Sequence, residues 1–172
     1  MALTLIKEDG TGKVDANAYA NAADGDAYHD GHLYASAWAA ASAGDKDKAL
    51  VMATRLIDGQ FQFDGIKASD AQALQWPRED CRDPDGDDAL PSDAVPKAVI
   101  EATCEMAREL LVVDRTAAPD GEGLKYYNDG TAQTGYDKSD TRPVISHVAQ
   151  ALLMKFGSLL KSKSGAVRLV RV

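Results

Sequence analysis

The stretch that decides the fold is VPKAVIEATCEMARELLVV, residues 95–113. Its apolar side chains, with one threonine among them, recur every three or four residues, which is the spacing of one face of an α-helix. They are Val95, Val99, Thr103, Met106, Leu110 and Val113. Ser92 or Asp93 is expected to cap this helix, and Pro96 fits its first turn, where backbone amides have no partner within the helix. The sequence therefore predicts a long amphipathic helix packed on a core.

Shorter helices are expected on both sides of this stretch. Asn21 and Asp24 have the spacing of a weak capping box for a helix that stops by Gly31, and Ser42 opens a clearer helix that Gly59 ends. A final helix is expected to start near residues 141–143. Its core positions would be Ile145, Val148, Leu152, Phe156 and Leu159.

The predicted fold class is mainly α: a small helical bundle with a short N-terminal strand, an inserted loop or hairpin and an extended C-terminal tail. The strand is expected at residues 3–6, before the turn sequence DGTG. One helical domain would span residues 1–160 and carry the insertion at residues 117–140. Residues 161–172 would form a flexible Ser/Gly/Lys linker and the tail.

Two segments are the candidate contact elements. Within the insertion, Lys125, Tyr126 and Tyr127 suggest a functional projection, because a loop of about two dozen residues is uncommon in a compact domain. The tail alternates apolar and basic residues as a strand does, through Val167, Arg168, Leu169, Val170, Arg171 and Val172. This tail either pairs within its own domain or adds a strand to a neighbour's sheet edge.

Charge is unevenly distributed along the 172 residues. From residue 141 onward there are six basic residues and no acidic ones, whereas the preceding part carries 13 basic and 27 acidic residues. An acidic body disfavours broad duplex binding, which depends on neutralising phosphates. The longest apolar stretches fall well short of a membrane span, and two isolated cysteines indicate a reducing compartment, so synthesis in the cytoplasm is expected.

Motifs for metal binding or catalysis are incomplete. The aspartates at 83, 85, 87 and 88 lack the glycine and glutamate positions of a calcium loop, and a solvated turn is the better interpretation. The GTGK run at 10–13 lacks the other residues of a phosphate-binding loop, so a tight turn is expected. His29 and His32 have no third zinc ligand placed by the sequence. The sequence therefore predicts no enzyme, no catalytic residues, no cofactor and no metal.

Several runs resemble one protein family over nearly the whole chain. They are EDGTG (8–12), ANAY (16–19), FDGIK (63–67), QALQWPR (72–78), the DG turn (85–86), LPSDAVPKAV (90–99), ATCE (102–105) and VRLVR (167–171). The most specific part comprises Gln72, Leu74, Trp76, Pro77 and Arg78. The chain resembles the head-to-tail adaptor, or head completion, proteins of tailed bacteriophages. Phage genomes also label this family as DnaT-like single-stranded-DNA-binding proteins.

The resemblance implies a structural virion protein at the head–tail junction. Such adaptors form a ring, commonly of twelve copies, between the portal protein and a tail-side connector or tail terminator, and viral DNA passes through the ring. Residues 167–172 would then grip the portal, and Trp76 would anchor its loop on the bundle. Lys125, Tyr126 and Tyr127 would form a channel or tail-side loop. The alternative that the family label implies is a single-stranded-DNA-binding replication protein. Net charge disfavours this alternative, while the Tyr/Lys insertion leaves it open.

Overall fold

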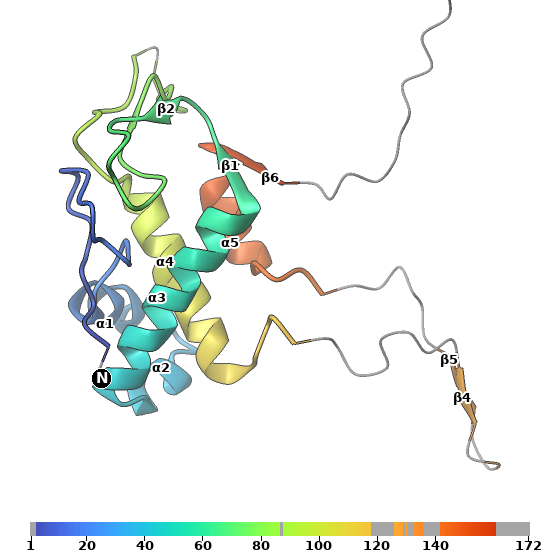
Figure 1. Cartoon of the computed structure of the whole chain (residues 1–172). Coiled ribbons are helices and arrows are strands. Elements are labelled where there is room, and N and C mark those ends of the chain that lie inside the picture. The colour runs from blue at the N-terminus through green and yellow to red at the C-terminus, as the bar shows by residue number, and fades with distance from the viewer. Residues whose placement is uncertain are drawn as a thin grey trace, which may run out of the picture.

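The computed structural model describes residues 3–86, 88–117, 126–128, 130, 133–135 and 142–160. Within these residues there are five helices: α1 (Ala22–Asp30), α2 (Ser36–Ala40), α3 (Ala43–Gln60), α4 (Lys97–Val112) and α5 (His147–Leu153). The strands form three two-stranded sheets. The expected fold class, mainly α with few short strands, is confirmed (Figure 1).

Helix α4 is the centre of the body. It runs antiparallel to α3, packs against α5, and contacts α1 and α2 near its lower end in the view of Figure 1. All six residues from 102 to 107 are buried, so the middle of α4 has no solvent-facing side. Thr103 and Met106 belong to the predicted apolar face, whereas the burial of Cys104 and Glu105 extends beyond it.

Two of the predicted helix starts are confirmed by their caps. Asn21 accepts a hydrogen bond from the backbone N–H of Asp24, whose carboxylate accepts one from Asn21 in return, which completes a capping box. Ser42 likewise accepts a hydrogen bond from Asp45 N–H at the start of α3. Helix α2 was not predicted, because five residues are too few to show a periodic pattern.

The start of α4 was predicted too early. The helix begins at Lys97 with Pro96 as its N-cap, and neither Ser92 nor Asp93 caps it. The reason is steric, because a residue before proline is disfavoured in helical conformation, and Val95 is that residue.

The last helix is shorter than predicted at both ends. Helix α5 begins at His147, capped by Ser146, and Val148 is 53% exposed, so the expected apolar face is incomplete. After α5 the chain forms strand β6 (Gly157–Leu159), which pairs antiparallel with β1 (Phe61–Phe63). Gly157 permits this pairing, because a Cβ there would lie 2.2 Å from Gln62 O. The pairing partner lies about a hundred residues away, which a local pattern does not reveal.

The remaining strands are short. Strand β2 (Ile66–Lys67) pairs with β3 (Arg78–Glu79), and β4 (Tyr126–Asn128) pairs with β5 (Gln133–Gly135), both antiparallel. The predicted strand at residues 3–6 is wrong. That segment has no strand assignment, and the nearest ladder element is a single parallel bridge between Lys7 and Ala18. The Asn17 side chain holds this segment instead. It accepts a hydrogen bond from Ile6 N–H and donates one to Thr4 O.

Glu8 explains why the glycine-rich turn is not a phosphate site. Its carboxylate is fully buried and accepts hydrogen bonds from the backbone N–H groups of Gly10, Gly12 and Lys13 at 2.8–2.9 Å. Successive amides of this kind form an anion-binding concavity. Here the protein's own carboxylate occupies the concavity, and the predicted tight turn is confirmed.

Both cysteines are buried free thiols, and burial raises the pKa of Cys104 to about 12.

Among the described residues, no helix combines the length and the apolar character that crossing a membrane requires.

Substituting Gly10 tests the importance of the N-terminal turn. Gly10 has a φ of +101°, and a Cβ there would lie 2.0 Å from the carbonyl oxygen of Asp93. We expect Gly10→Ala to lower the free energy of unfolding by about 3 kcal/mol, because both the conformation and the contact oppose a side chain. Gly44→Ala is the control, since Gly44 lies in α3 with open space around it. Urea unfolding that gave equal stability for the two variants would contradict this account.

Candidate functional site

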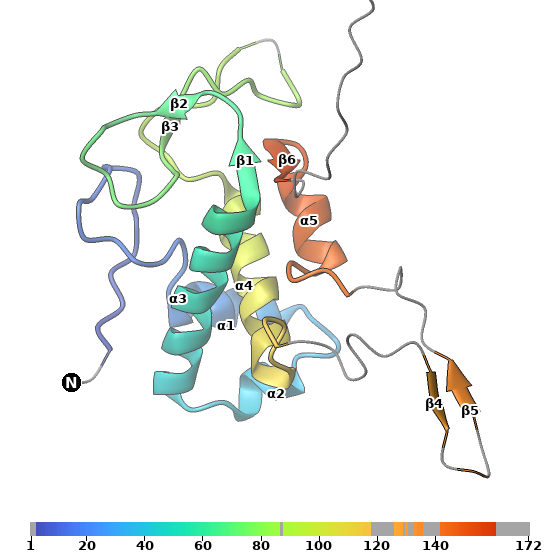
Figure 2. The same ribbon diagram turned by 45° about the vertical axis from the view of Figure 1, so that its right-hand side comes forward.

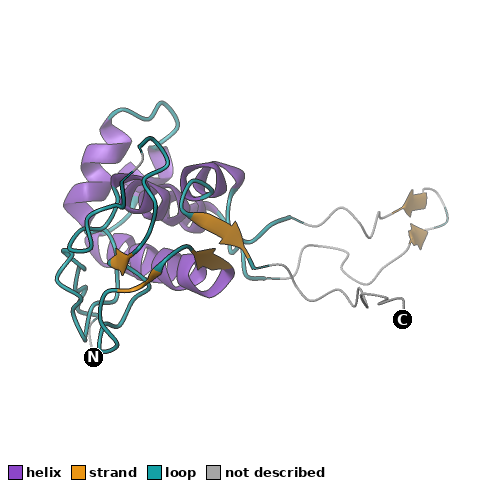
Figure 3. Cartoon of the chain, turned by 90° about the horizontal axis from the view of Figure 1, so that it is seen from above, coloured by secondary structure: helices purple, strands orange, loops and turns teal. Residues whose placement is uncertain are grey.

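A two-stranded arm is inserted between α4 and α5. Strands β4 and β5 pair with each other and lie apart from the helical body in three views (Figures 1, 2 and 3). The sequence left a loop and a hairpin open for residues 117–140, and the β4–β5 pairing agrees with the hairpin. Tyr126 and Tyr127 belong to β4, whereas Lys125 lies outside the described residues.

Arg115 joins the two ends of this insertion. Its guanidinium donates from Nε to Val144 O at 2.8 Å and from Nη2 to Pro143 O at 2.7 Å, across the whole inserted segment. Nη1 forms an ion pair with Glu109 at 3.0 Å, and the Arg115 side chain is only 8% exposed. Arg142 adds a hydrogen bond from Nη2 to Asp114 O at 3.2 Å. The base of the arm is therefore closed and attached to α4.

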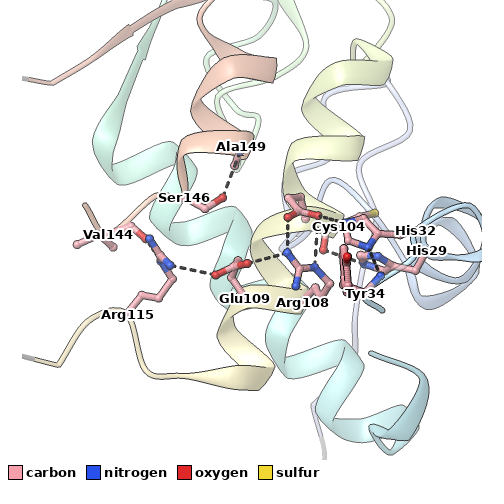
Figure 4. Close-up of polar contacts among 11 residues, drawn as sticks. His29, His32, Tyr34, Cys104, Arg108, Glu109, Arg115, Val144, Ser146 and Ala149 are labelled. Carbon is pink, nitrogen blue, oxygen red and sulfur yellow. Dashed lines mark hydrogen bonds and ion pairs between the residues drawn. The ribbon is translucent and has the colours of Figure 1, made fainter. Parts of the chain in front are cut away.

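The same ion-pair network continues along α4 (Figure 4). Arg108 Nη2 lies 2.6 Å from Glu105 Oε1 and 2.7 Å from Glu109 Oε1, so Glu109 is shared between Arg108 and Arg115. The Glu105 side chain is 1% exposed, and a buried carboxylate is stable only when it is paired. These ion pairs raise the pKa of Arg108 and keep its guanidinium charged.

The two histidines lie at the inner end of this network. His29 is buried, its Nε2 lies 3.2 Å from Cys104 O, and burial lowers its pKa. His32 is more exposed, and its Nε2 lies 3.8 Å from Glu105 Oε2. Among the described residues, no group of three or more potential ligands is arranged to hold a metal ion. His29 thus packs between α1 and α4, and His32 lies beside Glu105 at the end of the ion-pair network.

Trp76 attaches the long connection between β1 and α4 to the body. Its ring is fully buried and meets Phe63 and Phe156 edge-on, at centroid distances of 5.6 and 6.0 Å. The peptide bond between Trp76 and Pro77 is cis. This is the position that the sequence suggested for a residue anchoring its loop on the bundle.

Tyr19 and Asp58 hold the backbone before Trp76. The Tyr19 hydroxyl donates to Asp58 Oδ1 at 2.5 Å and accepts from the backbone N–H groups of Gln75 and Trp76. Gln75 N–H also donates to Asp58 Oδ2 at 3.1 Å. Burial raises the pKa of Asp58 to about 6 and raises that of Tyr19 well above its usual value.

Other residues of the same motif bind backbone carbonyls. Arg78 is 4% exposed and donates to Phe63 O, Asp64 O, Gly65 O and Gln75 O. The Gln72 amide donates to Leu74 O and Pro77 O. Leu74 is buried in the core. The motif at residues 72–78 therefore stabilises the connection between β1 and α4, and the side chains of Gln72, Trp76 and Arg78 are buried.

Sequence reasoning missed the arm base. No role was predicted for Arg108, Glu109 and Arg115, because charged residues near a helix end normally indicate a solvated surface. Glu105 entered only as part of the ATCE run of the family resemblance. One local signal could have indicated this network: the predicted helix at residues 95–113 carries charged residues on several faces as well as its apolar face. The predicted portal-binding segment, residues 167–172, lies outside the described residues.

Comparison with known proteins identifies a family. The family model described as "Putative DnaT-like ssDNA binding protein" matches residues 3–172, and the chain belongs to this family. Comparisons with curated proteins and with solved structures find no match. The family's description names single-stranded DNA and no virion component. It therefore agrees with the alternative function expected from the sequence more directly than with the adaptor function.

Substituting Arg115 tests whether it closes the base of the arm. We expect Arg115→Ala to lower the free energy of unfolding by about 2–4 kcal/mol, because Glu109 and two carbonyls lose a charged donor. Hydrogen exchange should accelerate at the start of α5 and the end of α4. Arg142→Ala is the control, since Arg142 is exposed and, among the described residues, donates one hydrogen bond, to Asp114 O at 3.2 Å. Equal exchange in the two variants would exclude the clamp.

Asp58 predicts a pH dependence of stability. Its pKa rises from 3.8 to about 6 on folding, so its contribution is complete below about pH 4 and is lost as pH rises through 6. Between pH 4 and 7 the wild type should lose up to about 3 kcal/mol relative to Asp58→Asn, since a change of one in pKa corresponds to about 1.4 kcal/mol. Urea unfolding at several pH values measures this difference. Parallel profiles for the two proteins would show that Asp58 does not titrate in this way.

Proposed function

We propose that this chain is a structural subunit that assembles into a ring at the head–tail junction of a bacteriophage virion, where it joins portal to tail and extends the DNA channel. The observation that carries the proposal is the clamped arm. Arg115 closes its base and ties it to α4, while β4 and β5 lie away from the body. Isolated two-stranded hairpins are marginal in water, so an arm of this kind is best explained by a neighbouring surface that it contacts.

Charge supports the same proposal. The chain up to residue 140 carries 27 acidic and 13 basic residues. A channel wall must let DNA slide, and an acidic surface repels phosphates where a basic one would retain them. The four basic residues from 161 onward would then be available for a protein partner.

The proposed partners follow the resemblance seen in the sequence. Residues 167–172 would add a strand to the portal protein, and the opposite face of the ring would meet a tail-side connector or terminator. The ring would contain about twelve copies, as the adaptor resemblance implies. Every copy would make the same contacts with its two neighbours. The chain would be assembled in the host cytoplasm and would act without a cofactor.

Single-stranded-DNA binding is the second candidate, and the family description favours it. Such binding combines basic groups with aromatic side chains on which bases stack. The insertion supplies Tyr126, Tyr127 and Tyr136 with Lys125 and Lys138. Five acidic residues in the same insertion oppose this role: Asp120, Glu122, Asp129, Asp137 and Asp140.

Mass spectrometry of purified, DNase-treated virions tests the proposal. We expect the chain in finished particles at a copy number close to that of the portal protein. Fluorescence anisotropy with labelled oligonucleotides should show no salt-sensitive binding by the purified chain. Absence from virions together with salt-sensitive binding would reject the adaptor function and establish the second candidate.

A further inference from the structure

The surface of α3 contains an apolar groove. One hollow of about 600 Å³ lies between α2, the first half of α3 and the end of α4. A second, of about 470 Å³, adjoins it towards the N-terminal segment, and the two share Lys48 and Met52. The apolar lining consists of Leu3, Ala37, Ala40, Ala41, Ala49, Val51, Met52, Leu56, Leu110 and Leu111. We call this surface the α3 groove.

The charged residues of the α3 groove are Asp45, Lys48 and Arg55. Lys48 Nζ pairs with Asp45 Oδ1 at 2.9 Å, so Arg55 supplies the net charge of +1 in a chain whose formal net charge is −8. Lys48 and Arg55 are exposed and lie seven residues apart on α3, on either side of Met52. The groove is thus a locally basic, apolar site on an acidic protein, and an acidic segment with large amphipathic side chains would complement it.

One segment of this chain has that composition. Residues 117–140 carry five acidic residues, two lysines, three tyrosines and Leu124. By contrast, residues 161–172 carry four basic residues and no acidic ones, so Lys48 and Arg55 would repel them. Charge complementarity therefore selects the arm over the C-terminal tail as the occupant.

The arm leaves the body just after the end of α4, where Leu110 and Leu111 line one end of the groove. The N-terminal segment, which lines the other end, and the β4–β5 strands lie on different sides of the body in all three views (Figures 1, 2 and 3). The clamp at Arg115 fixes the base of the arm, and β4–β5 lie away from the body. The arm is therefore placed to reach a second molecule, and an arm-to-groove contact between unlike surfaces can be repeated from copy to copy until a ring closes.

We propose that the β4–β5 arm of one copy occupies the α3 groove of the next copy. This contact rests on the proposed ring function and specifies how neighbouring subunits recognise one another. Tyrosine side chains would fill the hollows around Met52. The arm's carboxylates would pair with Arg55 at the rim and compete with Asp45 for the exposed Lys48.

The test uses two full-length variants that each lose one half of the contact. Met52→Glu places an acidic group in the groove, and Tyr126→Ser with Tyr127→Ser removes aromatic area from the arm. Val148→Glu is the matched control, because Val148 is 53% exposed on α5 and does not line the groove. Circular dichroism establishes that each variant is folded. Analytical ultracentrifugation then measures their assembly.

We expect the wild type and Val148→Glu to form oligomers and each disrupted variant to remain monomeric. Mixing the two disrupted variants should give a one-to-one heterodimer and nothing larger, because only one intact arm and one intact groove remain. A chain truncated after Leu160 should still assemble. Loss of assembly on truncation would identify the tail as the occupant and overturn the proposal.

Two further outcomes would also overturn it: assembly of Met52→Glu like the wild type, or a wild type that stays monomeric at every concentration reached. Failure here is distinguishable from failure of the proposed function. A chain found in virions at the copy number of the portal protein, with Met52→Glu still assembling, would keep the adaptor function and discard only this contact.

Discussion

Burial of α4 on every side is the constraint on which the rest of this structure depends. One helix packs against α1, α2, α3 and α5, so its middle turns have no face left for water. Glu105 lies in this stretch and is buried with its charge, which is tolerable only because Arg108 pairs with it. Packing around α4 thus requires an ion-pair network as well as an apolar core.

That network connects the core to the arm. Arg108 and Arg115 share Glu109, and Arg115 in turn binds the carbonyls on the far side of the insertion. The direction in which the arm leaves the body is therefore set by the position of α4. The proposed ring would need this property, because a small error in the direction of each contact would accumulate around the ring and prevent its closure.

A different part of the structure supports the opposite end of the body. Arg78 and Gln72 bind backbone carbonyls, and the Tyr19–Asp58 pair binds the amides before Trp76. The residues that most clearly marked the family resemblance thus satisfy the backbone of a long connection. A family signature of this kind identifies the fold more directly than the function, because its side chains face inward.

The sequence by itself determined the fold class, the helix starts at Asn21 and Ser42 and the acidic balance, since each depends on neighbouring residues or on composition. For the insertion it left a loop and a hairpin open. It placed the start of α4 too early and α5 too long, and it predicted a strand at residues 3–6. Only the tertiary structure decided the β1–β6 pairing, the occupation of the glycine turn by Glu8, the Arg115 clamp and the α3 groove. Most of these contacts join residues that are distant in the sequence, and all depend on atomic geometry. They stabilise the protein only once packing has brought the partners together, so local sequence patterns do not reveal them.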